Sequence, residues 1–216
     1  MKKIVTLIPA RGGSKGIKRK NIVDVNGSPL LTYAIEASRT SMVDETWVST
    51  DDDEIAEVSR KYGAQVIQRP SYISNDDSTS ELALLHFSKR KSFDILVFIQ
   101  ATCPFIKSED IDNAIKLMDK YDSVISVSKF DQFLWSGSAP MYEINNRLRR
   151  QDRIQNYVET GSIFVTTRQG LMDSKNRISG NVGFVHIPRW RSIDIDTYED
   201  LELVRKIMQT EIENKL

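Results

Sequence analysis

The stretch KIVTLIPARGGSKGIKRKN (Lys3–Asn21) joins a short, mostly apolar run to a glycine-rich, basic turn. The β-branched character of the run predicts a buried central strand. In the turn, backbone N–H groups can point at an anion, and the lysines and arginines add positive charge. Glycine suits such a turn because a β-carbon would obstruct phosphate oxygens.

The turn matches neither the Walker A pattern nor the dinucleotide fingerprint G-x-G-x-x-G. A basic surface turn is the plainer interpretation of an isolated glycine-lysine cluster. Here, however, the cluster follows a buried strand at the sheet edge where α/β proteins bind ligands. We therefore interpret it as a phosphate site.

Outward from this stretch, apolar strands alternate with amphipathic helices. FDILVFIQ (93–100) is apolar enough to be a strand buried on both faces. The alternation predicts an α/β fold with a mostly parallel, mixed sheet. Helices are expected at 29–40, 51–63, 78–91 and 108–121, and the other strands at 45–50, 64–70, 122–130, 161–167 and 182–188. Residues 192–209 read as a strand tip that runs into a C-terminal helix.

The alternation stops between residues 131 and 160, where the sequence is polar, aromatic and poorly periodic. This segment is interpreted as an inserted arm within one domain that covers residues 1–216.

Composition gives no global reason to expect nucleic acid or a membrane as a partner. Lysine plus arginine and aspartate plus glutamate number 30 each, so the net charge is zero. The first apolar run is interrupted by Pro9 and Arg11, so it is read as a strand and not as a signal peptide. The single cysteine, Cys103, excludes an internal disulfide and fits a cytoplasmic protein.

Seven segments, in order, resemble the acylneuraminate cytidylyltransferases, also called CMP-sialic acid synthetases. They are IPARGGSKGIKRKNI (8–22), QRP (68–70), DDSTS (76–80), QATCP (100–104), RRQD (149–152), YVETGSIF (157–164) and SIDIDT (192–197). The resemblance implies a three-layer, Rossmann-like nucleotidyltransferase fold with an inserted dimerisation arm. It also implies conversion of CTP and a nine-carbon α-keto acid sugar into the CMP-sugar and pyrophosphate.

The resemblance assigns the opening loop to the triphosphate. Arg11 would grip phosphate oxygens in a fork, and Lys20 would stabilise charge at the α-phosphate. Lys18 and Arg19 are expected to be solvated only. The implied nucleotide-binding set is Ala10, Arg11, Gly12, Gly13, Ser14, Lys15, Lys20, Asn21, Arg69, Thr79 and Ser80. Ser78, Thr79 and Ser80 could instead cap a helix. One of these three residues is expected both to cap the helix and to contact the nucleotide.

Asp194 and Asp196 alternate on one predicted strand face, with Ile193 and Ile195 opposite. Two carboxylates so placed can share one Mg²⁺ or Mn²⁺. By itself the alternation more often marks a strand end, with Asp196 as a helix cap. The resemblance favours the metal site, where the cation would bridge phosphate and sugar oxygens.

For the sugar, the resemblance implies contacts from six residues: Gln100, Thr102, Arg150, Gln151, Tyr157 and Glu159. Arg149 could replace Arg150 opposite the sugar carboxylate, since the motif fits with a shift of one residue. Thr160 stands where the family more usually has asparagine, which puts the acyl-group preference in doubt. Cys103 and both histidines are expected to be ordinary packing or surface residues.

In the family, the arm reaches across a two-fold dimer and lines the partner's site, so a homodimer is expected. Its DQFLWS segment (131–136) resembles the version in animal members. Ketodeoxyoctulosonate enzymes have a different N-terminal motif, without GGSKG. Pseudaminic acid enzymes usually have Arg-Ile-Pro where this chain has Gly16-Ile17-Lys18. Legionaminic acid stays open as a substrate. A nucleotide-binding regulatory module without turnover is the alternative from another class.

Overall fold

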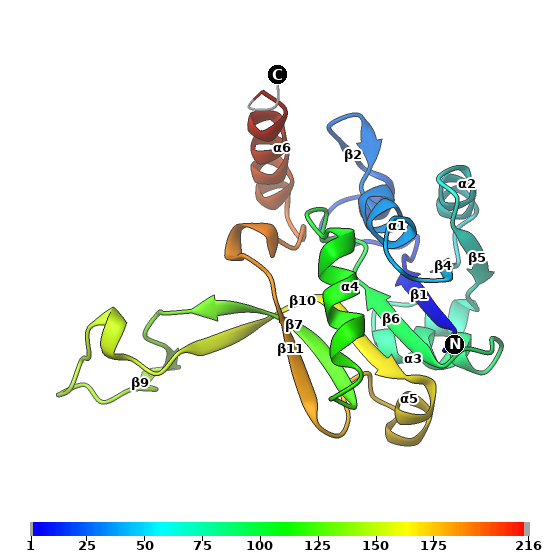
Figure 1. Cartoon of the computed structure of the whole chain (residues 1–216). Coiled ribbons are helices and arrows are strands. Elements are labelled where there is room, and N and C mark those ends of the chain that lie inside the picture. Colours follow the sequence, from blue (N-terminus) through cyan, green and yellow to red (C-terminus); the bar gives the residue numbers. More distant parts are fainter. Residues whose placement is uncertain (1, 214–216) are drawn as a thin grey trace.

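The computed structural model describes residues 2–213, and a seven-stranded sheet forms its centre (Figure 1). The strand order is β11-β7-β10-β6-β1-β4-β5. The strands are β1 (Ile4–Pro9), β4 (Glu45–Thr50), β5 (Gln65–Gln68), β6 (Ile95–Ile99), β7 (Ser123–Phe130), β10 (Asn156–Thr167) and β11 (Val182–His186). Only β10 runs antiparallel to its neighbours within this sheet. The predicted mostly parallel, mixed sheet is confirmed.

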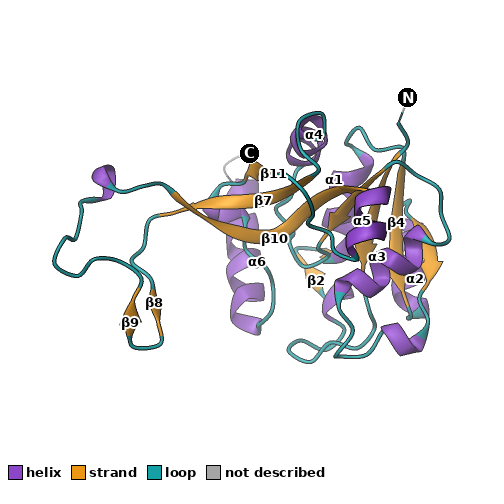
Figure 2. Cartoon of the chain, turned by 90° about the horizontal axis from the view of Figure 1, so that it is seen from below, coloured by secondary structure: helices purple, strands orange, loops and turns teal. Residues whose placement is uncertain are grey.

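Helices cover both faces of the sheet, which gives three layers (Figure 2). Side chains of β6 alternate between the two cores: Val97 packs on one face and Phe98 on the other. Because both faces are covered, a continuous apolar strand is stable there. One layer holds α1 (Leu31–Arg39), α2 (Asp53–Lys61) and α4 (Ser108–Leu117), and the other holds α3 (Ser80–Ser88) and α5 (Arg168–Ser174).

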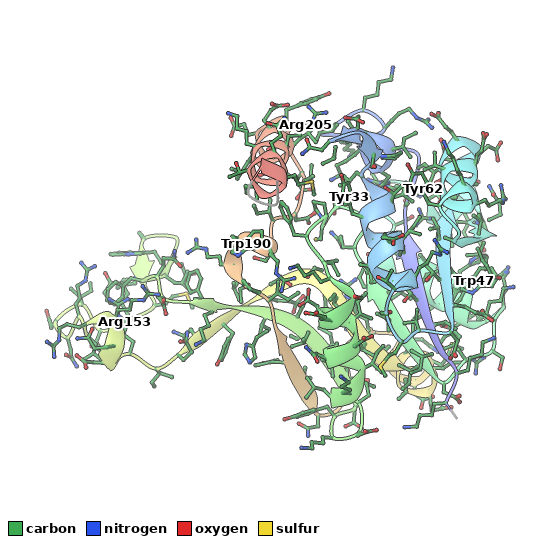
Figure 3. All side chains as sticks on the ribbon, turned by 45° about the horizontal axis from the view of Figure 1, so that its top comes forward. Tyr33, Trp47, Tyr62, Arg153, Trp190 and Arg205 are labelled. Atoms are coloured by element: carbon green, nitrogen blue, oxygen red, sulfur yellow. The ribbon has the colours of Figure 1, made fainter. Side chains whose placement is uncertain are left out.

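A third apolar cluster joins helix α6 (Tyr198–Glu213) to the hairpin of β2 (Asp24–Val25) and β3 (Ser28–Pro29). Arg205 donates to the carbonyl of Asp24 at 2.6 Å, and the Tyr33 hydroxyl on α1 donates to the carbonyl of Val25 at 2.6 Å. Figure 3 shows Tyr33 and Arg205 on neighbouring elements. The apolar cluster and the Arg205 hydrogen bond hold α6, which follows the segment that carries Asp194 and Asp196, against this hairpin.

Beyond the sheet, β7 and β10 continue as a two-stranded ribbon that carries the arm away from the body (Figures 1 and 2). The arm contains the hairpin of β8 (Trp135–Ser136) and β9 (Ala139–Pro140) and the short 3-10 helix η3 (Arg150–Asp152). β10 begins at Asn156, five residues before the predicted strand, because 156–159 pair with β7. The irregular part of the predicted arm is therefore 131–155.

Two further boundaries differ from the sequence expectations. Helix α1 begins at Leu31, and Pro29 belongs to β3. Residues 192–196 form no strand, although Ile195 is buried and its N–H donates to the carbonyl of Thr102 at 3.0 Å. Across residues 2–213, none of the helices combines the length and the apolar character that crossing a membrane requires.

Candidate active site

A pocket of about 330 Å³ opens at the carboxyl ends of the parallel strands β1, β5 and β6. β1 has β4 on one side and β6 on the other, so the strand order reverses at this point. Ligands of open α/β sheets bind at such reversals. The pocket is lined by Pro9, Arg11, Ser14, Lys15, Gly16, Lys20, Asn21, Arg69, Ser78, Thr79, Ser80, Phe98, Gln100, Ala101, Thr102 and Asp196.

The glycines of the loop after β1 serve two different purposes. A β-carbon at Gly16 would lie 2.5 Å from the carbonyl oxygen of Asp196, and one at Gly12 would lie 2.7 Å from a carboxylate oxygen of Asp52. These two glycines let the loop pack against its own protein. Gly13 has no atom within 4 Å of such a β-carbon, so this backbone is open to an approaching group.

Arg19 is not merely solvated, which corrects the sequence expectation. Its guanidinium donates to both carboxylate oxygens of Asp52, at 2.9 and 3.0 Å, and it lies 2.6 Å from Glu54. The hydrogen bond to Asp52 is the main cause that raises the pKa of Arg19. Arg19 thereby ties the loop to the start of α2. Lys18 is exposed, as expected, and pairs with no carboxylate among the described side chains.

Arg69 is a cation almost without partners in the pocket wall. Its side chain is 6% exposed, and its nearest carboxylate, Asp51, lies 3.9 Å away. Its Nε and one Nη have no hydrogen-bond acceptor among the described residues. Burial lowers the pKa of Arg69, although Asp51 opposes the shift. Buried donors normally have acceptors, so a ligand that supplies them would bind well here.

Asn21 and the 78–80 segment complete the wall. Asn21 is buried on η1 (Lys20–Ile22), and its amide donates to the carbonyl of Arg11 at 2.9 Å. Thr79 stands at the N-cap of α3, but its side chain accepts no capping hydrogen bond from the described helix. The Ser78 hydroxyl donates to Asn75 at 2.7 Å. The expectation that one of these hydroxyls caps the helix is thus wrong for Thr79, which lines the pocket.

Asp194 is the buried member of the acidic pair. One oxygen accepts a hydrogen bond from Gln100 at 3.1 Å, and the other is buried and has no well-formed hydrogen bond within residues 2–213. Burial raises the pKa of Asp194, and the charge of Asp196 raises it further, while Thr102, Lys20 and Gln100 oppose the shift. The predicted strand face is wrong, but the two carboxylates do lie near each other.

Asp196 is the exposed member, and it faces Lys20 at 2.7 Å. It does not cap α6. The backbone N–H groups of Asp196 and Thr197 donate to Asp200 at 3.1 and 2.8 Å, and the N–H of Asp200 donates back to the Thr197 hydroxyl at 3.2 Å. This reciprocal pair is a capping box. It leaves the carboxylate of Asp196 free to meet Lys20 and the pocket.

The acidic pair fits a divalent cation. Asp194 offers a buried oxygen without a well-formed hydrogen bond, and Asp196 offers an exposed carboxylate. Within the described chain no group of three His, Cys, Asp or Glu side chains could hold a metal by itself. Mg²⁺ is commonly bound by one or two carboxylates together with substrate phosphates, so two are sufficient.

The predicted sugar contacts are divided between two places. Gln100 and Thr102 line the pocket. Arg150, Gln151, Tyr157 and Glu159 do not line it. They lie on the arm and on the exposed part of β10.

Local partners hold two of these outlying side chains, Arg150 and Tyr157. Arg150 pairs with Asp131, and Arg149 pairs with Asp152 at 3.0 Å. The Tyr157 ring packs on Phe184 and His186, with ring centroids 5.8 and 5.1 Å apart.

Among the predicted nucleotide contacts, Ala10, Gly12 and Gly13 also stand outside the lining. Ala10 is buried, and its N–H donates to the carbonyl of Ser49 at 2.9 Å. Cys103 is fully buried, as expected of a packing residue. Burial first, and then the charges of Asp194 and Asp196, raise the pKa of its thiol well above the ordinary value. Such a thiol is a poor nucleophile.

Sequence reasoning missed three acidic residues around the loop: Asp51, Asp52 and Asp76. The N–H of Gly12 donates to Asp51 at 3.1 Å, and Asp76 pairs with both Arg11 and Lys15 at 2.9 Å. A run of three aspartates at the end of β4 was the available signal. From the sequence alone, this run marks only the start of the helix expected at 51–63.

The fold and the pocket place the chain among three-layer α/β proteins that bind ligands at the carboxyl ends of parallel strands. Residues 5–213 match the family model of cytidylyltransferases, and the chain belongs to this family.

Three relatives illustrate the range within the family. N-acylneuraminate cytidylyltransferase B of Danio rerio is 35% identical over 88% of this chain and 48% of its own length. N-acylneuraminate cytidylyltransferase of Escherichia coli O18:K1:H7 is 29% identical over 99% of this chain and 54% of its own. Pseudaminic acid cytidylyltransferase of Campylobacter jejuni strain 81-176 is 30% identical over 94% of this chain and 95% of its own. The chain thus spans about half of the N-acylneuraminate relatives.

Two solved structures support the fold. A CMP:2-keto-3-deoxy-manno-octonic acid synthetase complexed with CTP superimposes with a TM-score of 0.78 at 20% identity, over 97% of this chain and 99% of that one. The 4-diphosphocytidyl-2C-methyl-D-erythritol synthase of Anaerococcus prevotii gives 0.73 at 17% identity, over 96% and 99%. The predicted Rossmann-like nucleotidyltransferase fold is confirmed.

Proposed function

We propose that this chain transfers CMP from CTP to the anomeric hydroxyl of a nine-carbon α-keto acid sugar. The hydroxyl oxygen gives up its proton to water and bonds to the α-phosphorus, the bond between that phosphorus and the bridging oxygen breaks, and pyrophosphate leaves. The observation that carries the proposal is one pocket lined by Arg11, Lys15, Lys20 and Asp196, in which Lys20 faces Asp196 and the lining residue Gln100 donates to the buried Asp194. The names of the relatives supply the substrate class.

Three cations, Arg11, Lys15 and Lys20, stabilise the negative charge of the triphosphate. Arg11 and Lys15 hold the β- and γ-phosphates, whose charge is left on the pyrophosphate. Lys20, kept in place by Asp196, stabilises the charge that grows at the α-phosphate. Asp194 and Asp196 would hold Mg²⁺ or Mn²⁺, and the bound cation would supply Lewis-acid activation of phosphate and sugar oxygens.

The nucleoside lies against the other wall. Buried Arg69 donates to the cytosine, whose acceptors satisfy its orphan N–H groups. Asn21, Thr79 and Ser80 contact the nucleoside and ribose. Backbone from Ala10 to Ser14 approaches the phosphates, and Gly13 leaves room for it.

The sugar lies beside Gln100 and Thr102, and the remaining contacts come from a second copy of the chain. Arg150, Gln151, Tyr157 and Glu159 sit on the arm and ribbon, away from the pocket of their own chain. An arm that extends from the body can reach the pocket of a two-fold partner. The active form is therefore a homodimer, and its single buried cysteine suits the cytoplasm.

The alternative is a nucleotide-binding module without turnover. The acidic pair argues against it, because binding of a nucleotide does not need a buried carboxylate beside the reacting phosphate. Among sugars, the relatives favour N-acylneuraminic acid and leave pseudaminic acid as a candidate, and legionaminic acid belongs in the same panel.

Pyrophosphate release from CTP and Mg²⁺, measured with a panel of nine-carbon sugars, tests the proposal. We expect release with at least one sugar and none with the eight-carbon ketodeoxyoctulosonate. Asp194→Asn should bind CTP and release little pyrophosphate. Tight CTP binding without pyrophosphate release in the presence of any of the sugars would instead establish a regulatory module without turnover.

A further inference from the structure

Asp76 bridges two cations of the phosphate loop, Arg11 and Lys15. One of its carboxylate oxygens lies 2.9 Å from Arg11, and the other lies 2.9 Å from Lys15. A single anion thus satisfies both cations, one oxygen each. This is the arrangement that the oxygens of a phosphate would adopt between the same two side chains.

The loop that carries Asp76 belongs to the pocket rim. It lies between the 3-10 helix η2 (Ser71–Ile73) and α3, and Ser78–Ser80, two residues further on, line the pocket. The Asp76 side chain is 42% exposed, so water and solutes reach it. Lys15, chiefly, lowers the pKa of Asp76, so the carboxylate is charged at neutral pH.

We propose that Asp76 is a displaceable counterion that sets which anions the phosphate site accepts. The proposal rests on the assignment of Arg11 and Lys15 to the phosphates of CTP. An anion that enters the site must replace the carboxylate at both cations. A triphosphate or pyrophosphate can do so, because it carries several oxygens and charges along its length. Inorganic phosphate is a weaker competitor, since it carries less charge and fewer oxygens than the longer anions.

The expected change in anion affinity follows from the exposure of the two ion pairs of Asp76. Exposed pairs are weak individually, so the carboxylate competes without blocking the site. Removing its charge should tighten binding of inorganic pyrophosphate about 3–10-fold at low salt. The gain should shrink between about 50 mM and 500 mM NaCl, because salt screens exposed charges.

The test compares Asp76→Asn with Asp77→Asn by isothermal titration of pyrophosphate and of inorganic phosphate. Asp77 is the neighbouring exposed carboxylate, and it pairs with no cation of the described chain. Both variants lose the same charge at almost the same position. We expect tighter binding only in Asp76→Asn, with a larger gain for inorganic phosphate, so that selectivity for the longer anion falls. Asp76→Glu, which keeps the charge, should behave like the parent.

Equal behaviour of the two Asn variants would overturn the proposal. Weaker binding in Asp76→Asn would also overturn it, because Asp76 would then position the cations instead of competing for them. Neither result depends on turnover. If the parent protein bound pyrophosphate but never released it from CTP, the proposed function would fail while the role of Asp76 could still be decided.

Discussion

Lys18 and Lys20 are two residues apart and have different surroundings. Lys18 is exposed and pairs with no carboxylate whose side chain the structure describes. Lys20 is 16% exposed, lines the pocket and faces Asp196. Side-chain direction, which depends on the short helix at Lys20, separates a solvated lysine from a pocket lysine. Charge at this density could be predicted from the sequence, but the direction of each side chain could not.

Lys20→Ala should lower kcat and leave the KM for CTP almost unchanged. The ammonium meets more negative charge as the sugar oxygen attacks, so its stabilisation appears mainly in the transition state. Losing one such preorganised contact typically costs about 10²–10³ in kcat. Lys20→Arg should rescue in part, because a guanidinium is broader than a point charge. Steady-state pyrophosphate release measures this, and Lys18→Ala is the matched control. A crippled Lys18→Ala beside a normal Lys20→Ala would refute the assignment.

Asp194→Asn should stabilise the free protein while it abolishes most turnover. Burial raises the folded pKa of Asp194 above its ordinary 3.8. A group with a raised pKa adds stability below its unfolded pKa and loses it as pH rises through the folded pKa. The ionised carboxylate at neutral pH therefore costs stability, which asparagine would avoid. We expect Tm at pH 7 to rise and the difference from the parent to vanish at acid pH. A lower Tm at pH 7 would contradict this account.

At the scale of elements, uniform burial made some strands predictable. β6 is apolar throughout and buried on both faces, and β1 is nearly so, and both were found where expected. Residues 192–196 alternate like a strand but form none, because Ile195 docks on Thr102 and Asp200 draws the backbone into the cap of α6. Tertiary contacts override a two-residue period there.

The N-terminal end of α4 is fastened to this segment by a buried ion pair. Arg191 donates to Asp110 at 2.5 and 2.9 Å and to the carbonyl of Phe105 at 3.2 Å. Asp110 also accepts from the N–H of Lys107 at 3.0 Å, so it caps the helix as well. The pair anchors the chain three residues before Asp194.

Asp110→Ala should therefore destabilise the protein by about 3–5 kcal/mol, because Arg191 would be left buried without its counterion. Urea unfolding provides the measurement. Glu202→Ala removes an exposed partner, at 2.6 Å from Arg205, and should change stability by less than about 1 kcal/mol. Similar values for the two variants would show that burial does not govern the Asp110 pair.

At the scale of the whole molecule, the pocket and the arm differ in how much the sequence reveals. The loop, Arg69, Gln100 and Asp196 meet in one chain, so motifs in order along the sequence could predict their grouping. Arg150 and Tyr157 lie outside that pocket. No pattern in a single sequence can predict whether the arm contributes to the pocket of another subunit. A partner's position is not encoded in any single-chain periodicity.

The arm has a small core of its own but leaves much apolar surface uncovered. Phe133 packs on Tyr142, with ring centroids 4.4 Å apart, and Arg153 lies over its face at 3.8 Å. Figure 3 shows Arg153 on the arm, away from the body. Trp135 is still 53% exposed and Ile154 is 87% exposed. Apolar groups gathered at this density on a projecting element indicate an interface.

The protein should therefore be a dimer in dilute solution, and Trp135→Glu/Ile154→Glu should dissociate it, because each charge would have to be buried in the interface. Light scattering coupled to gel filtration would give twice the chain's mass for the parent and one chain for the double variant. The monomer should still bind CTP, since the lining of the nucleotide pocket comes from one chain. It should release little pyrophosphate, since Arg150 and Tyr157 would no longer reach a partner's sugar.

Leu203→Glu, on an exposed face of α6, adds a charge at a 49% exposed leucine and should leave mass and activity unchanged. A fully active monomer, weighed and assayed at the same concentration, would rule out the shared site.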